Sequence, residues 1–64
     1  MKYCVYTNAS ARTLTAKFDD FEDAKKFVDR KKTKYGHTVM EIGDNGFPTG
    51  NNYRTEGNRQ YENE

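Results

Sequence analysis

The chain has one cysteine and one histidine, Cys4 and His37, and these residue types could supply a nucleophile and its general base. Each stands in a strand-like run, and the spacing indicates no third group that would orient the imidazole. Asp19 and Asp20 resemble a metal-binding carboxylate pair, but they precede an apolar helical pattern, where helix capping explains them better. The sequence contains no Cys-x-x-Cys, no paired histidines and no glycine-rich phosphate loop. We therefore expect no enzymatic activity, no cofactor, no metal site and a buried, inert Cys4.

A basic run in the middle of the chain has the composition of a nucleic-acid contact. Its lysine and arginine side chains could follow a phosphate backbone while an adjacent aromatic ring stacks on a base. The same cations would also complement the dipole at the end of a helix. The net charge of the whole chain is only +1, so no global field attracts it to nucleic acid. The candidate nucleic-acid-binding residues are Arg30, Lys31, Lys32, Lys34 and Tyr35.

Tyrosines supply a second candidate surface. Tyrosine offers a large, rigid contact area and is enriched at protein interfaces. Tyr3 and Tyr6 lie on opposite sides of the first strand-like run, so a tyrosine reaches the solvent-facing side of a small sheet whichever side is buried. Others stand in a polar C-terminal segment that could become ordered on binding. The ordinary alternatives are a half-solvated sheet and an inert tail. The candidate partner-binding residues are Tyr3, Tyr6, Tyr53, Arg54 and Tyr61.

One amphipathic helix is expected to organise these residues. Asp20 suits the N-cap position, and Asp23 three residues later completes a weak capping box. Gly36 can adopt the left-handed conformation that ends many helices. We therefore predict a helix over residues 21–35. Its apolar stripe consists of Phe21, Ala24, Phe27, Val28 and Tyr35.

Three strand-like runs surround this helix, at Lys2–Thr7, residues 12–18 and His37–Ile42. A short loop makes the first two an antiparallel hairpin, and a right-handed crossover places the third run beside the first. The prediction is an α+β domain, β-β-α-β, with one helix on a three-stranded antiparallel sheet of order 2-1-3. The other face of the sheet is left uncovered. The expected core is Leu14, Ala16, Phe18, Phe21, Ala24, Phe27, Val28 and Ile42.

The end of the chain reads differently. Residues 43–46 form a strong turn signal, and Pro48 disfavours a full strand after it. Residues 49–64 contain two tyrosines and otherwise only polar residues and glycine. We therefore predict a domain at residues 1–48 and a flexible, disordered tail at residues 49–64.

Cysteine content and hydropathy bear on location. Small secreted domains usually need several disulfides, and a single cysteine cannot form one within the chain. The first residues lead directly into a strand pattern without an apolar run of signal-peptide length, and no segment has the roughly 20 apolar residues of a membrane span. We expect a cytoplasmic protein without membrane contact.

The runs at residues 18–27 and 35–42 resemble a pattern common among very small bacteriophage-encoded proteins, which pair a hairpin with a helix and a further strand. The resemblance covers residues 2–42. It implies a protein of the bacterial host cytoplasm that modulates a host process or blocks a defence system by binding a larger protein. The leading expectation is thus a non-enzymatic protein-binding module or inhibitor, with a homodimer through the uncovered sheet face also possible. The alternative is a small nucleic-acid-binding protein.

Overall fold

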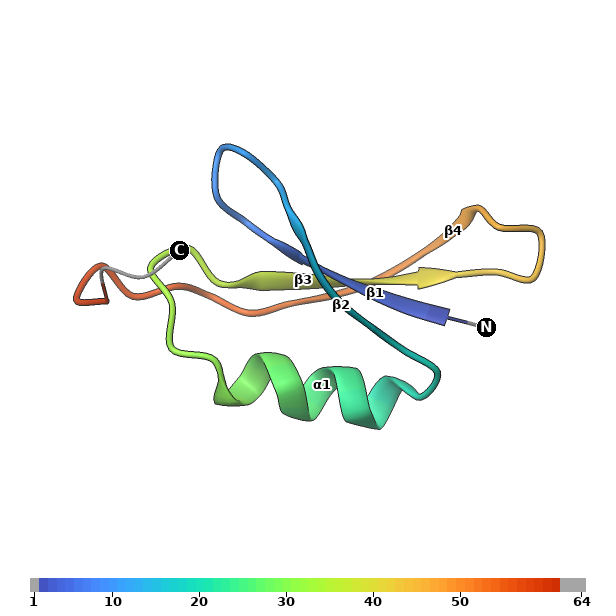
Figure 1. The fold of residues 1–64 in the computed structure, drawn as a ribbon, viewed down its shortest axis with the longest axis horizontal. Coiled ribbons are helices and arrows are strands. Elements are labelled where there is room, and N and C mark those ends of the chain that lie inside the picture. Colours follow the sequence, from blue (N-terminus) through green and yellow to red (C-terminus); the bar gives the residue numbers. More distant parts are fainter. Residues whose placement is uncertain (1, 62–64) are drawn as a thin grey trace.

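The fold is one antiparallel sheet with a single helix across one of its faces (Figure 1). The computed structural model describes residues 2–61. The strand order is β2-β1-β3-β4, so the predicted α+β class and the 2-1-3 order are confirmed, and a fourth strand extends the predicted three. The elements are β1 (Lys2–Thr7), β2 (Leu14–Phe18), α1 (Phe21–Arg30), β3 (His37–Ile42) and β4 (Pro48–Arg54).

The core lies between α1 and the two central strands. Because Ala24 and Val28 are one helical turn apart, they point together at the sheet and are fully buried. Val5 from β1 and Val39 from β3 stand opposite each other and meet them there. Burying each valine or larger apolar side chain contributes about 1.5–3 kcal/mol. Partly buried side chains that pack around this centre are Tyr3, Ala16, Phe18, Phe21, Phe27 and Tyr53.

Leu14 was expected in the core, and this prediction is wrong. Val5 pairs with Ala16, but the next residue of β1, Tyr6, pairs with Leu14, so Thr15 is an extra residue in β2. Such a β-bulge moves the residues beyond it to the other side of the sheet. Leu14 therefore faces away from α1 and is 43% exposed.

Ile42 was also expected in the core and lies on the other face. In β3 the residue opposite Val5 is Val39, which is 1% exposed. Because side chains alternate along a strand, Ile42 points to the side opposite Val39. The alternation in β3 was recognised correctly, but the wrong face was assigned to the core.

Helix α1 ends at Arg30, five residues before the predicted end. Lys31 already has an extended backbone, with φ −75° and ψ 128°, and its N–H donates to the Val28 carbonyl at 3.2 Å. No apolar residue stands between Val28 and Tyr35, so a longer helix would bury nothing further against the sheet. Tyr35 is 45% exposed. Gly36 has a left-handed φ of +81°, but it turns the chain into β3 instead of capping the helix.

The start of α1 agrees with the prediction in position. Asp20 is the N-cap residue with an extended backbone, and its carbonyl accepts the Ala24 N–H at 3.3 Å. Its side chain makes no capping hydrogen bond, so acidic residues act here through the helix dipole. At ten residues, α1 is too short to cross a bilayer, and the described part of the chain contains no other helix.

The segment predicted to be a disordered tail contains β4, which pairs with β3 along the sheet edge. Beyond β4, the Thr55 N–H donates to the His37 carbonyl at 2.8 Å, and the Asn58 N–H donates to the Thr33 carbonyl at 3.0 Å. Residues 55–61 therefore run back beside the connection between α1 and β3 (Figure 1). The prediction of disorder is wrong for this part, and residues 62–64 lie outside the described residues.

Candidate functional site

The face of the sheet opposite α1, called the open face below, carries side chains from all four strands. Strand pairing defines its members, because directly opposed residues of an antiparallel sheet point to the same side. No helix or strand lies over this face within residues 2–61. Three rows cross the sheet: Leu14, Tyr6, Thr38 and Arg54; then Lys17, Cys4, Met40 and Asn52; then Lys2, Ile42 and Pro48.

The middle of the open face is apolar. Tyr6, Met40 and Ile42 are partly exposed, and Leu14 is the most exposed of the group. Cys4 stands between them and is only 9% exposed, since its neighbours on both strands cover it. These side chains form a contiguous apolar strip across three strands, which is the kind of surface that proteins bury against partners.

Among residues 2–61, every charged strand residue on the open face is basic. Lys17 and Arg54 lie at its two edges on β2 and β4, and both are exposed. Lys2 has its Nζ 3.9 Å from an oxygen of Asp19, but both side chains are largely exposed, so this ion pair contributes little. The acidic strand residue Glu41 points to the α1 side. The open face therefore combines an apolar centre with a positive rim.

The five predicted partner-binding residues do not form one surface. Tyr6 and Arg54 share a row of the open face, separated by Thr38. Tyr3 and Tyr53 lie on the α1 side, each with its ring 5.8 Å from that of Phe21. The fifth, Tyr61, follows β4 and lines a hollow beside the end of α1. The structure thus brings one tyrosine and one arginine of the set to the open face.

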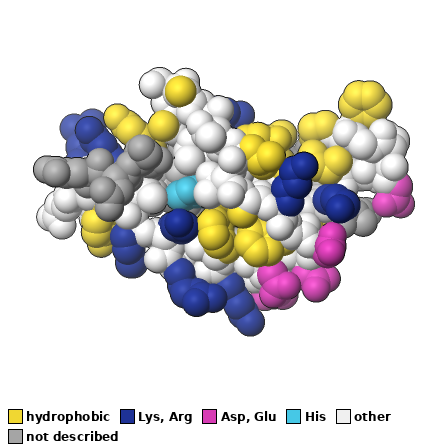
Figure 2. Space-filling view, in the orientation of Figure 1, with side chains coloured by type: hydrophobic (Ala, Val, Ile, Leu, Met, Phe, Trp, Pro, Cys, Tyr) yellow, Lys and Arg dark blue, Asp and Glu magenta, His cyan; other side chains and the backbone are white. Residues whose placement is uncertain are grey.

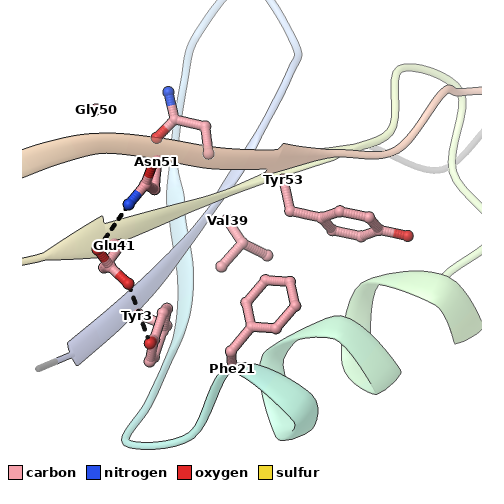
Figure 3. Close-up of a pocket in the computed structure, with 8 residues that line it drawn as sticks. Tyr3, Phe21, Val39, Glu41, Gly50, Asn51 and Tyr53 are labelled. Atoms are coloured by element: carbon pink, nitrogen blue, oxygen red, sulfur yellow. Dashed lines mark hydrogen bonds between the residues drawn. The ribbon is translucent and has the colours of Figure 1, made fainter.

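A second surface lies on the α1 side, in a groove of about 550 Å³ between the start of α1 and strand β4 (Figure 3). Helix α1 packs mainly on β1, β2 and β3, and the groove lies between the helix and β4 at the edge of the sheet. The groove is lined by the rings of Tyr3 from β1, Phe21 from α1 and Tyr53 from β4, with Val39 between the helix and the sheet. We call it the aromatic groove. The other lining residues are Glu41, Gly50, Asn51 and Asn52.

The carboxylate of Glu41 is the charged group of the aromatic groove. Its Oε1 accepts hydrogen bonds from Thr49 Oγ1 at 2.7 Å and Asn51 Nδ2 at 3.2 Å. Its Oε2 accepts one from the Tyr3 hydroxyl at 3.2 Å (Figure 3). The bonds from Thr49 and Asn51, followed by that from Tyr3 and by the positive charge of the N-terminal amino group, lower the pKa of Glu41, so its carboxylate is anionic at neutral pH. Partial burial and the same carboxylate raise the pKa of Tyr3.

An irregularity in β4 aims the two donors at Glu41. Met40 pairs with Asn52 and Ile42 with Pro48, so β4 has two more residues than β3 over this stretch. Gly50 lies in the enlarged segment with φ +95°, a conformation that favours glycine. The side chains on either side of Gly50 therefore both reach Glu41. Bulges of this kind commonly re-aim side chains near functional sites.

Tyr53 joins β4 to the helix at the other end of the groove. Its hydroxyl donates to Asp29 Oδ1 at 2.9 Å, and the Nζ of Lys25 lies 5.7 Å from its ring centre. Lys25 also forms an ion pair with Asp29 at 3.2 Å. Hydrogen bonds from Tyr53 and Lys25 lower the pKa of Asp29, and the bond to Asp29 raises the pKa of Tyr53.

The predicted nucleic-acid residues lie together at the end of α1 and in the connection after it. Figure 2 shows lysine and arginine side chains along the lower left of the molecule and acidic ones at the lower right, where α1 begins. Lys31 places its Nζ 5.0 Å from the Phe27 ring centre, and Lys34 lies 5.4 Å from that of Tyr35. No ion pair joins any of these cations to an acidic residue within residues 2–61.

Cys4 and His37 do not form a catalytic pair. Cys4 pairs with Met40 on the open face, whereas His37 is 2% exposed and packs its ring edge-on to Phe27 on the other side. Within residues 2–61, no three His, Cys, Asp or Glu side chains gather closely enough to hold a metal ion.

Sequence reasoning missed the aromatic groove, because Glu41, Thr49 and Asn51 come together only through strand pairing. The one local signal was Gly50 within a run of small polar residues, which is compatible with a bulge as well as with a tail.

Comparisons of the chain with protein-family models, curated proteins and solved structures find no match.

Proposed function

We propose that the chain is a non-enzymatic protein-binding module that docks through its open face on a larger protein. The observation that carries the proposal is the apolar strip of Tyr6, Leu14, Met40 and Ile42 on an uncovered sheet face. Contiguous apolar surface on a small domain is usually buried against a partner. Tyr6 stands in the middle of the strip, where binding energy tends to concentrate at interfaces.

The positive rim indicates which kind of partner surface would be complementary to the open face. Lys2, Lys17 and Arg54 surround the strip without a carboxylate among them on the strands. A complementary surface is apolar at its centre and carries aspartate or glutamate at its edge. A second copy of this chain fits less well, because a two-fold contact through the open face would place these cations against one another. We therefore favour an acidic protein surface over a homodimer.

An inhibitor or modulator is the form of binding module that we propose. The open face is a shallow sheet surface without catalytic groups. The protein would therefore act by covering a functional surface of its target. The resemblance to small bacteriophage proteins motivates a bacterial protein as the target and the host cytoplasm as the place of action.

The basic end of α1 supports a second candidate function. Arg30, Lys31, Lys32 and Lys34 are exposed and have no carboxylate partner within residues 2–61. Tyr35 beside them has an exposed ring that could stack on a base. Binding of single-stranded nucleic acid there would weaken by orders of magnitude between low and moderate salt, because each phosphate contact releases counterions.

Affinity capture from bacterial lysate with wild type, Tyr6→Glu and Tyr35→Glu separates the two functions. Tyr6→Glu places a charge at the centre of the open face, and Tyr35→Glu makes the same change at the basic end. The proposal expects one stoichiometric protein that survives nuclease, is retained by Tyr35→Glu and is lost with Tyr6→Glu. Circular dichroism verifies that both variants remain folded. Nucleic acid would be favoured instead if nuclease treatment or Tyr35→Glu abolishes capture of the partner while Tyr6→Glu still captures it.

A further inference from the structure

We propose that the aromatic groove is a separate binding site for a small molecule with a primary ammonium group. The site lies on the side of the sheet that faces α1, away from the open face. Its volume of about 550 Å³ is in the range of small-molecule pockets. The inference therefore concerns a ligand that would bind independently of the protein partner.

Charge and aromatic rings together define the class of ligand. Glu41 is an anion in a groove whose walls are the rings of Tyr3, Phe21 and Tyr53. No lysine or arginine within residues 2–61 forms an ion pair with it, although the positive charge of the N-terminal amino group also lowers its pKa. Aromatic faces attract cations through their quadrupole, and the adjacent carboxylate adds a direct charge. An organic cation matches both parts of this lining, whereas a neutral apolar ligand matches only the rings and an anion matches neither.

The hydrogen bonds of Glu41 favour an ammonium that carries N–H groups. A carboxylate offers about four acceptor positions on its two oxygens. Thr49 and Asn51 occupy Oε1, and Tyr3 occupies one position on Oε2. By this count, one acceptor position on Oε2 remains for an N–H group of a ligand. A quaternary ammonium has no hydrogen to donate there and would depend on the rings alone.

The surrounding structure holds the carboxylate in place before any ligand arrives. Three donors fix its orientation: Tyr3 from β1, and Thr49 and Asn51 on either side of Gly50 in the irregular part of β4. Tyr53 is held in turn by its bond to Asp29. Preorganisation of this kind reduces the ordering cost of binding.

Titration of the ¹⁵N-labelled protein with butylammonium tests the proposal, and 1-butanol serves as the uncharged probe of similar size. We expect saturable amide shifts at Glu41, Gly50, Asn51 and Tyr53, with a midpoint on the order of 1 mM for butylammonium. Butanol should give no saturable shifts at these positions in the same range. Equal responses to the two probes, or shifts confined to other parts of the chain, would overturn the proposal.

A variant pair isolates the carboxylate. Glu41→Gln keeps the size of the side chain and removes its charge, and it should weaken butylammonium binding at least about tenfold. Glu56→Gln makes the same change in net charge outside the groove and should bind like wild type. Unchanged binding by Glu41→Gln would contradict the proposed role of Glu41. Should Glu41→Gln fail to fold, the comparison of the two probes on wild type still decides the question, and tetramethylammonium binding as tightly as butylammonium would refute the N–H contact.

Discussion

Replacing Tyr53 with alanine tests whether β4 belongs to the folded domain. The Tyr53 ring packs against the core, meets the Phe21 ring edge-on at 5.8 Å, and donates its hydroxyl to Asp29. Truncating a fully buried aromatic residue costs about 3–5 kcal/mol, and Tyr53 is only partly buried. We expect Tyr53→Ala to lower the free energy of unfolding by about 2 kcal/mol, including the aromatic contact.

Thermal unfolding followed by circular dichroism measures this effect. In a domain of this size, 1 kcal/mol shifts the melting temperature by about 4–8 °C, so Tyr53→Ala should lower it by about 8–16 °C. Tyr53→Phe removes only the hydroxyl bond at an exposed site, worth about 0.5 kcal/mol, and should shift it by about 2–4 °C.

The neighbouring residue supplies the matched control. Arg54 lies on the same strand, but it is exposed and points to the open face. Arg54→Ala should change stability by no more than about 0.5 kcal/mol. If Tyr53→Ala and Arg54→Ala both have the melting temperature of the wild type, β4 contributes nothing to the core. The interpretation of residues 49–61 as a tail would then be right.

Further predictions concern the core, one glycine and the acid response. Phe27→Ala should cost about 2–3 kcal/mol in urea unfolding, because the ring is partly buried against the core, and a loss below about 1 kcal/mol would contradict that packing. Gly36→Ala should be much more damaging than Gly46→Ala, since both have positive φ but only at Gly36 would a Cβ overlap the Thr55 carbonyl; equal melting temperatures would refute this. The lowered pKa of Glu41 means that its carboxylate stabilises the fold above the unfolded-state pKa of about 4.3, and this contribution is lost as pH falls through the lower folded-state value. Glu41→Gln should therefore lose less stability than wild type between pH 5 and about pH 2, and parallel acid-unfolding curves would contradict the assignment.

The central helix and the first three strands could be predicted because their patterns are local. Phe21, Ala24, Phe27 and Val28 have the 3.6-residue period of one helical face, and the structure places all four against the core. Strand alternation likewise located β3 correctly. The choice of which face is buried depends on pairing across the sheet, which no single strand reveals, and Ile42 was misassigned for that reason.

The remaining differences have the same physical origin. One extra residue at Thr15 turns Leu14 outward, and a bulge of this kind has no strong composition signal. Strand β4 contains a single apolar side chain that faces α1, Tyr53, so hydrophobic patterning could not detect it. Its position comes from backbone pairing with β3 and from the two donors to Glu41, which are properties of the assembled sheet.

The candidate sites show a comparable division. The basic residues at the end of α1 lie close together in sequence, so they were found as a cluster before the structure. The positive rim of the open face was not found as a cluster in the sequence, because Lys2, Lys17 and Arg54 come from three different strands. The positions of the tyrosines did not indicate one common surface, since Tyr6 lies on the open face whereas Tyr3 and Tyr53 line the aromatic groove.

The affinity of the captured protein for two charge-reversed variants tests the central claim most directly. Lys17→Glu with Arg54→Glu reverses the rim of the open face, and Lys26→Glu with Lys32→Glu makes the same change in net charge on the α1 side. Isothermal titration should show affinity lowered at least about tenfold by the first pair and little changed by the second. Equal losses for both pairs, or a loss only with Lys26→Glu and Lys32→Glu, would contradict docking through the open face.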